Sequence, residues 1–409
     1  MAVRRDADVP VSSRPRKMMT IIARSLAPYL PDALIFSILS RLPSKSAIRC
    51  KSVCKAWHAM ISDCHFVNHH LELSKAACQS MLVLPLSYCR AAAHEGLVSF
   101  WMDFYTSGAG NVAAELIYSE HIPQGIGRCA QPVHCDGLIL VPTLRQEYIV
   151  CNPATREFVT LPKGSHNHNE KHHRIGFGFD PSSDRYKVAR FFYQPKKDGT
   201  SETICRFEVL TLGTHEWRQT VDPPYPLMGV TPAHVRGAIY WMVNLPCVGE
   251  HPNVFIRFDL SNEEFTLTPC PPCERTEPTY FIELEGQLCC ACFTKKRFIE
   301  TRDLVEIWIC NQTEPPTWTR RCTIPISKDW IVPYPTGGFK LPKVMFWEKD
   351  LLLVCDYKAY RFCVQTGQIK EVAGALKNRQ YYDPRNNSYT MFLGKDVDFY
   401  IANYAESLV

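Results

Sequence analysis

The C-terminal two thirds of this 409-residue sequence repeat one pattern, in which short apolar segments alternate with turn residues. In the clearest copy, residues 176–219, two short turns (181–184 and 213–215) and a polar loop separate four apolar segments. Segments of this kind, bounded by Gly, Pro, Ser and Asp, predict antiparallel β-strands. Hydrophobic residues at the fourth segment of five copies lie 48 to 59 residues apart: Phe158, Trp217, Phe265, Trp318 and Ile369.

A four-stranded unit of about 50 residues has the size of a β-propeller blade, and the pattern resembles kelch-like blades more than helical repeats. We therefore expect an all-β, kelch-like propeller over residues 71–409, with a two-sheet sandwich array as the alternative. Because a ring that combines N- and C-terminal strands in one blade has no open sheet edge, we expect six blades, with seven as the alternative. The flanking strand-like runs that supply this blade are 81–86, 97–104, 114–119, 389–393 and 399–404.

Residues 30–66 have a helical periodicity instead. An apolar stripe about 140° wide predicts a helix that Pro43 ends, and Ser44 is placed to cap the next helix. About 40 residues bury too little apolar surface to be stable alone, so this segment should dock on another surface. The first stripe contains Leu34, Ile35, Ile38, Leu39 and Leu42, and a second contains Val53, Ala56, Trp57, Met60 and Ile61.

These helices resemble a plant-type F-box. The resemblance rests on Leu30-Pro31-Asp32, Ile38 to Pro43, Lys45-Ser46, Ile48-Arg49, Val53-Cys54-Lys55, Trp57 and Ile61-Ser62-Asp63, all in register. Cys64 replaces the usual proline and Ala33 a larger or acidic residue, but neither belongs to the apolar stripe. The resemblance implies binding to the Skp-type adaptor of a cullin–RING ubiquitin ligase, and the alternative is a helical hairpin that packs on its own C-terminal domain. The implied adaptor-binding residues are Leu30, Pro31, Ile35, Ile38, Leu39, Leu42, Pro43, Ile48, Val53 and Trp57.

The repeat region also resembles the F-box-associated domain of plant F-box proteins, more loosely and over some 280 residues. The similar segments are Cys151 to Arg156, Gly176 to Asp180 and the terminal Tyr404 to Val409. The expected fold class is therefore α+β multidomain, with a small all-α F-box module before an all-β propeller. The expected domains are a disordered basic tail (1–25), the F-box (26–70) and the propeller (71–409).

Composition limits the cell compartments in which we expect to find the protein. No apolar run reaches the 18 or so residues that span a bilayer, and no secretory signal is visible. The 19 cysteines are odd in number, and many lie in strand-like runs, which is typical of reduced, buried thiols. We expect a cytoplasmic or nuclear protein, or both. The basic tail is interpreted as solvated, with a transit peptide or a nuclear signal as alternatives. The strand cysteines are Cys151, Cys205, Cys289, Cys290, Cys310, Cys355 and Cys363.

Loop lengths predict which face of the propeller recognises a partner. Within each blade, the turns that join the first strand to the second and the third to the fourth are tight. The loops that join the second strand to the third, and one blade to the next, are mostly long and lie on the opposite face. Long loops on a rigid scaffold often carry binding residues, and their mild positive charge favours an acidic or phosphorylated partner. The candidates on this face are Lys196, Lys197, Tyr225, Lys295, Lys296, Arg297, Trp330 and Tyr334.

Motifs with apparent chemistry favour structural roles. The four histidines of 165–173 lack the other ligands of a rigid metal site and indicate a solvated loop. Cys270 and Cys273, with Cys289, Cys290 and Cys292, approximate a zinc pattern, but strand alternation should turn Cys289 away from its neighbours. Gly176-x-Gly178 precedes no phosphate-binding helix, and no nucleophile elbow, Walker loop, zinc-protease motif or Cys–His spacing is present. We expect no catalytic residue, metal or cofactor.

The leading interpretation is a non-catalytic substrate-recognition subunit. Its F-box would bind the adaptor and, through it, the cullin and RING subunits, while its propeller would bind a protein substrate; neither nucleic acid nor membrane is expected. One alternative is an adaptor-bound protein that sequesters or relocates a partner without ubiquitin transfer. Another is a propeller lectin or enzyme tethered by an F-box.

Overall fold

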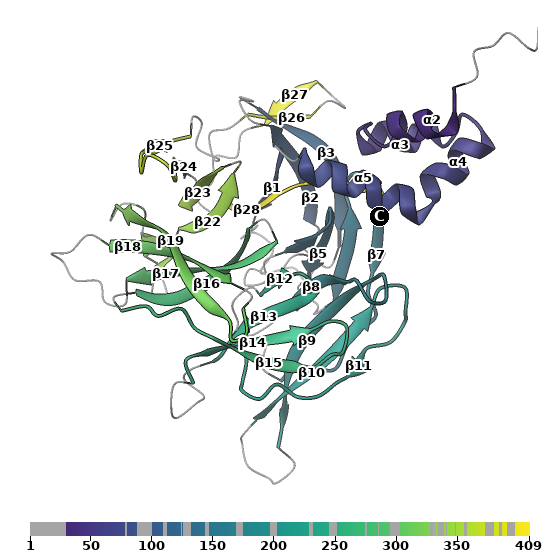
Figure 1. The fold of residues 1–409 in the computed structure, drawn as a ribbon. Helices are drawn as coiled ribbons and strands as arrows, with labels where there is room; N and C mark the ends of the chain where they lie inside the picture. Colours follow the sequence, from purple (N-terminus) through teal and green to yellow (C-terminus); the bar gives the residue numbers. More distant parts are fainter. Residues whose placement is uncertain are drawn as a thin grey trace, which may run out of the picture.

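The computed structural model describes most of the chain between residue 30 and the C-terminus. The described residues are 30–77, 80–87, 100–108, 113–123, 125, 132–143, 147–168, 175–196, 203–228, 232–244, 252–274, 276–284, 286–294, 303–311, 313–327, 330, 332–333, 339–340, 342–347, 349–355, 358–372, 380–383, 387–390 and 397–409. Residues 1–29, which include the basic tail, lie outside this part. The described residues form an N-terminal group of helices followed by a ring of β-sheets (Figure 1).

Four helices form the helical module: α2 (Asp32–Leu39), α3 (Ser44–Cys50), α4 (Lys55–Ser62) and α5 (Cys64–Ala76). The first helix is shorter than its apolar stripe predicts, because the chain tightens after Leu39 into a turn in which Leu42 N donates to Leu39 O. Two of the other helices have side-chain caps: Cys54 Sγ accepts from Trp57 N, and Asp63 Oδ1 accepts from His65 N. In the described part of the chain, no helix has the length and apolar character needed to cross a membrane.

The expected cap at Ser44 is wrong. Ser44 is the first residue of α3, follows the N-cap position at Pro43, and has a buried Oγ without a hydrogen-bond partner among the described residues. Its backbone N–H instead donates to Glu406 Oε2 at 2.8 Å. The cap of this helix therefore comes from the far end of the chain.

The β-strands form six blades, as predicted. Blade 1 contains β28 (Val397–Asn403), β1 (Ser80–Ser87), β2 (Phe100–Gly108) and β3 (Ala113–Ile122), and β26 (Gln380–Asp383) and β27 (Ser388–Thr390) extend it outward. Blade 2 contains β4 (Val133–Cys135), β5 (Leu138–Pro142), β6 (Tyr148–Asn152) and β7 (Glu157–Thr160). Blade 3 contains β8 (Ile175–Asp180), β9 (Arg185–Pro195), β10 (Thr203–Thr211) and β11 (Arg218–Gln219).

The remaining blades repeat the same order from the innermost strand outward. Blade 4 contains β12 (Ala233–Val235), β13 (Ala238–Met242), β14 (Val254–Asp259) and β15 (Phe265–Pro269). Blade 5 contains β16 (Thr276–Leu284), β17 (Gln287–Thr294), β18 (Asp303–Asn311) and β19 (Thr317–Ile326). Blade 6 contains β22 (Lys343–Trp347), β23 (Asp350–Cys355), β24 (Lys358–Phe362) and β25 (Ile369–Glu371), and a separate pair, β20 (Val332–Pro333) and β21 (Phe339–Lys340), precedes it.

The ring closes through blade 1. Its innermost strand, β28, comes from the C-terminus and pairs antiparallel with β1, with Met81 opposite Asn403 and Ser87 opposite Val397. The innermost strands contact one another in the order β4, β8, β12, β16, β22 and β28, and a hydrogen bond of 2.8 Å between His134 Nδ1 and Tyr400 OH links β28 back to β4. The prediction that N- and C-terminal strands share a blade is therefore confirmed.

Each junction between blades contains its own hydrophobic cluster, and the junction between blades 4 and 5 contains two. Because side chains alternate along a strand, one strand serves two junctions. In β1, Leu82 and Leu84 pack toward blade 2, whereas Met81 and Val83 pack toward blade 6. The core is thus a ring of inter-blade layers, which explains why the inner strands are apolar on both faces.

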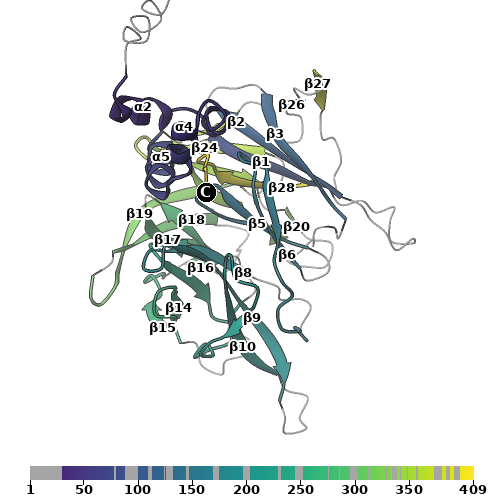
Figure 2. The same ribbon diagram turned by 90° about the vertical axis from the view of Figure 1, so that its right-hand side faces the viewer.

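Tight turns and long loops lie on opposite faces of the ring. The β4–β5 and β12–β13 turns have two successive residues with positive φ, at Asp136-Gly137 and Arg236-Gly237, as type I′ hairpins require. The helical module contacts this tight-turn face, because Lys75 of α5 forms an ion pair with Asp136. Figures 1 and 2 show the β9–β10 hairpin extending away from the helices.

Candidate functional site

The outer face of α2 carries an apolar surface that the protein itself leaves uncovered. Leu34 and Ile38, one helical turn apart, are 51% and 55% exposed, and Leu30, just before the helix, is 53% exposed. Val53, in the turn before α4, is 61% exposed. These four side chains are half of the large exposed hydrophobic residues found in the described part of the chain. A concentration of this kind indicates a binding surface for another protein.

The predicted adaptor-binding residues divide into two groups. Leu39 is buried in the core of the helical module with Ile61 and Phe66. Ile35, Leu42, Ile48 and Trp57 are partly buried and pack against that core, whereas Leu30, Pro31, Ile38, Pro43 and Val53 are exposed. The first group holds the helices together and the second can contact a partner. Leu34 belongs with the second group, and the stripe contained it although the set of predicted adaptor-binding residues did not.

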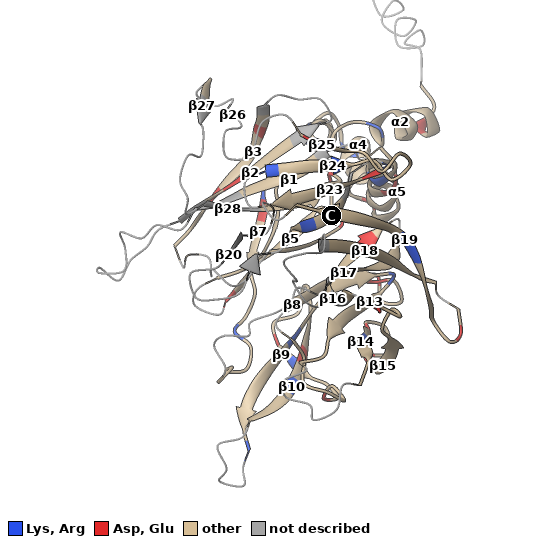
Figure 3. Ribbon diagram, turned by 90° about the vertical axis from the view of Figure 1, so that its left-hand side faces the viewer, with Lys and Arg blue, Asp and Glu red and all other residues tan. Residues whose placement is uncertain are grey.

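The structure describes three of the predicted residues of the long-loop face. The prediction that Trp330 is available to a partner on this face is corrected, because the residue is only 9% exposed. It lies in the cluster between blades 5 and 6 and stacks on Tyr360 with ring centroids 4.4 Å apart. Tyr225 is partly buried against the cluster between blades 3 and 4, and Lys196 directly follows β9. Figure 3 shows acidic and basic residues interspersed over the described strands. The other candidates, Lys197, Lys295, Lys296, Arg297 and Tyr334, lie outside the described residues.

The histidine and cysteine motifs occupy different surroundings. His166 and His168 have ring centroids 4.7 Å apart, and His172 and His173 lie outside the described residues. Cys290 and Cys292 face the cluster between blades 4 and 5 while Cys289 faces the one between blades 5 and 6, as strand alternation predicts. Among the described residues, no group of three or more His, Cys, Asp or Glu side chains has an arrangement suited to a metal ion.

Burial keeps the clustered thiols protonated at neutral pH. Cys270 and Cys273 pack against the same cluster as Cys292, and the Sγ atoms of Cys273 and Cys292 are 3.1 Å apart. Burial, with a smaller contribution from Cys273, raises the pKa of Cys270 to about 12. Burial likewise raises the pKa of Cys310 to about 11. Protonated thiols are weak nucleophiles, and none of the described cysteines forms a disulfide.

A cysteine and a histidine that the sequence did not pair meet near the ring centre. Cys135 Sγ of β4 lies 3.6 Å from His234 Nδ1 of β12, and His234 Nε2 lies 3.3 Å from Phe179 O. Burial is the main cause that lowers the pKa of His234 and raises the pKa of Cys135. Desolvation also lowers the pKa of the neighbouring His134 to about 4. Both members of the pair are therefore neutral at pH 7, which suits packing between blades and does not supply a thiolate.

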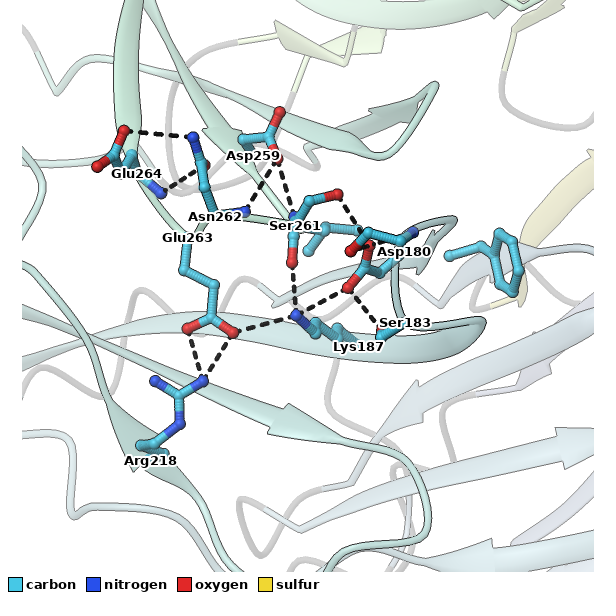
Figure 4. A network of polar contacts seen from close by, with 12 residues as sticks. Asp180, Ser183, Lys187, Arg218, Asp259, Ser261, Asn262, Glu263 and Glu264 are labelled. Carbon is cyan, nitrogen blue, oxygen red and sulfur yellow. Dashed lines mark hydrogen bonds and ion pairs between the residues drawn. The ribbon is translucent and has the colours of Figure 1, made fainter.

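A polar network joins blades 3 and 4 on the tight-turn face (Figure 4). Lys187 Nζ, on a 7% exposed residue, contacts Asp180 Oδ2 at 2.9 Å and Glu263 Oε1 at 3.1 Å, and Arg218 donates to both oxygens of Glu263. Burial alone would raise the pKa of Asp180, but hydrogen bonds from Ser183, Ser182 and Lys187 outweigh it, so the pKa lies well below its usual range. Every buried charge here has an opposite partner, which indicates a structural junction.

One contact near the helical module was missed by the sequence analysis. Leu408 packs in the core of the helical module, and Glu406 accepts the hydrogen bond from Ser44 N. The segment Tyr404 to Val409 stood out in the sequence, but no pattern linked it to helices more than 300 residues away. Only the spatial contact reveals the link.

Comparisons with known proteins match both parts of the chain. Residues 110–364 match the F-box associated beta propeller domain, and residues 27–72 match the F-box-like domain. An F-box/LRR-repeat protein of Arabidopsis thaliana is 26% identical over 327 residues, which are 74% of this chain and 71% of that protein. A putative F-box protein of the same plant is 27% identical over 351 residues (81% and 83%), and a putative F-box/kelch-repeat protein is 26% identical over 246 residues (58% of each).

Proposed function

The chain belongs to the F-box-associated β-propeller family, and from that premise we propose that it is the substrate-recognition subunit of a Skp–cullin–F-box ubiquitin ligase. In this role the helical module binds the Skp-type adaptor, which connects it to the cullin and RING subunits. The propeller binds a protein substrate. The chain supplies proximity between substrate and ubiquitin, and other subunits supply the catalytic groups. We expect it to act in the cytoplasm, the nucleus or both.

The exposed apolar face of α2 is the observation that carries the proposal. Leu34 and Ile38 are more than half exposed in a helix whose opposite side is buried in the helical module. Leaving such residues in water is unfavourable, and a partner that covers them removes that cost. The Skp-type adaptor is the partner that an F-box implies.

The first test measures binding to a purified Skp-type adaptor. A Leu34→Ala, Ile38→Ala double variant and a Leu30→Ala, Pro31→Ala double variant should each lose at least about thirtyfold in affinity, because truncation of a buried interface anchor typically costs about 2 kcal/mol or more. The fold should be unchanged, since all four residues are exposed in the free chain. Isothermal calorimetry gives the affinity, and circular dichroism checks the fold.

A matched control alters exposed apolar residues elsewhere. Val159 and Leu267 are 57% and 47% exposed on the outer strands β7 and β15, so the Val159→Ala, Leu267→Ala variant should bind the adaptor like the unaltered chain. Unchanged adaptor affinity in both test variants would contradict the proposal. Reconstitution with cullin and RING subunits then separates ubiquitin transfer from sequestration, because only the former attaches ubiquitin to the captured partner.

A further inference from the structure

The last six residues, which we name the C-terminal bridge (Tyr404–Val409), leave the innermost strand of blade 1 and pass between the two domains. On one side, the C-terminal bridge contacts the helical module. Leu408, 8% exposed, is a member of the same hydrophobic cluster as Leu39, Ala47 and Phe66. A residue that follows the last propeller strand thus completes the hydrophobic core of the helical module.

The other side of the C-terminal bridge is fastened to blade 2. Asn152, the last residue of β6, donates through Nδ2 to Ser407 O at 3.1 Å and to Val409 O at 3.0 Å. Gly137, in the β4–β5 turn, approaches so closely that an added Cβ would lie 2.7 Å from Ala405 O. The bridge backbone therefore lies in van der Waals contact with the tight-turn face, and Ser407 is completely buried.

Glu406 supplies a hydrogen-bond acceptor that α3 lacks. The N-cap residue of α3 is Pro43, and no side-chain cap forms within the helical module. The Glu406 carboxylate accepts from Ser44 N at 2.8 Å, across a separation of 362 residues. A negative charge at a helix N-terminus satisfies an orphan N–H and interacts favourably with the helix dipole.

These contacts fix an orientation as well as a distance. The helical module is held at the N-terminus of α3 by Glu406, in its core by Leu408, and on α5 by the ion pair between Lys75 and Asp136. Attachments at three separate places in the helical module resist its rotation on the propeller better than a single contact would.

We propose that the C-terminal bridge holds the helical module in one orientation on the propeller and, resting on the proposed function, thereby positions a bound substrate for ubiquitin transfer. Glu406 and Leu408 are positioning residues in this scheme and contact neither substrate nor ubiquitin. A rigid connection keeps the effective concentration of the substrate high at the transfer site, while a loose connection spreads it over many positions.

The first experiment measures amide hydrogen exchange in the full chain. Glu406→Ala should raise exchange of the α3 amides about fivefold, the equivalent of a lost helix cap, and Leu408→Ala should raise it throughout the helical module. Exchange in blades 3 to 5 should not change. Glu406→Gln keeps an acceptor oxygen and should restore most of the protection. Glu216→Ala, an exposed glutamate in the β10–β11 turn, is the matched control.

The second experiment compares adaptor affinity with ubiquitin transfer by the reconstituted ligase. Glu406→Ala should leave adaptor affinity unchanged, because α2 carries the exposed apolar face, and should lower the transfer rate; Glu406→Gln should recover it. Unchanged amide exchange in both the Glu406→Ala and the Leu408→Ala variants would show that the C-terminal bridge does not hold the helical module. Increased exchange with an unchanged transfer rate would overturn its positioning role. Absence of adaptor binding by the unaltered chain would instead refute the proposed function, and the exchange experiment would still decide on the bridge.

Discussion

In this propeller, one aspartate carboxylate can both shape a tight turn and contact a neighbouring side chain. Asp180 Oδ1 accepts from Ser182 N at 2.9 Å and thereby shapes the β8–β9 turn, and its other oxygen pairs with Lys187. Asp259 Oδ1 likewise accepts from Ser261 N at 2.8 Å in the β14–β15 turn, and Ser261 Oγ reaches back to Asp180. A short polar side chain can thus fix a turn and a neighbouring blade together, as Asx turns allow.

These contacts predict how stability depends on pH. Burial would raise the pKa of Asp180 and Asp259, but hydrogen bonds outweigh it and lower both pKa values below the ordinary 3.8. Because the folded chain then holds fewer protons than the unfolded chain, this stabilisation is complete above the unfolded pKa and is lost as the pH falls through the folded pKa. We expect the melting temperature to fall below about pH 4.

Asp180→Asn should flatten that dependence and cost about 1–3 kcal/mol at pH 7, because it removes one of the two carboxylates that pair with the buried Lys187. Thermal unfolding between pH 3 and 7 measures both effects. The exposed Asp184 of the same turn provides the control, and Asp184→Asn should behave like the unaltered chain. An Asp180→Asn variant with the original pH dependence would contradict the assignment.

At the scale of elements, strand spacing at the ring centre depends on glycine. The Gly176-x-Gly178 motif lies on β8 and leads into a hairpin, as expected of a motif without a phosphate-binding helix. An added Cβ at Gly178 would lie 2.6 Å from His234 Cγ, and one at Gly176 would lie 2.8 Å from Ile239 Cγ2. Both glycines therefore allow blade 4 to approach blade 3.

Gly178→Ala should lower the free energy of unfolding by about 1–3 kcal/mol, because the new methyl group overlaps the His234 ring and forces the blades apart. Denaturant unfolding measures the loss. A Gly178→Ala, His234→Ala double variant should be less destabilised than the sum of the two single variants, since the space freed by the ring accommodates the methyl group. Additive losses would show that the contact is not the cause.

At the scale of the whole molecule, the C-terminal segment makes two separate contacts with earlier parts of the chain. β28 closes the ring against β1, and the six residues after Asn403 connect the ring to the helical module. Closure removes open sheet edges, and the connection gives the helical module one defined orientation. The helical module contacts the tight-turn face, and the β9–β10 hairpin extends away from the helices (Figure 1).

Deletion of residues 397–409 should prevent ring closure, because it removes β28 and leaves the inner edge of β1 unpaired. The truncated chain should aggregate or be digested rapidly by trypsin. Deletion of residues 405–409 keeps β28 and serves as the control: its propeller should remain soluble and protease-resistant. A soluble, resistant chain without β28 would mean that closure contributes little to stability.

Patterns that depend on neighbouring residues were readable without a structure. Turn residues and apolar alternation predicted the four-stranded units and the strand-like runs that flank them, because strand period and turn chemistry are local properties. The requirement that a ring close then predicted six blades. The apolar stripe of Leu34 and Ile38 marked the first helix for the same reason. The boundaries were less accurate: the first helix ends at Leu39, before the stripe does.

The sequence by itself therefore determined the elements and their order, and only the tertiary structure decided which surfaces they share. It separated exposed Ile38 from buried Leu39, placed Trp330 in the core, and joined Glu406 to Ser44. A helical or strand period identifies residues on one face of an element, but what covers that face depends on segments far away in the chain. Contacts across 362 residues carry no periodic signal, so packing alone reveals them.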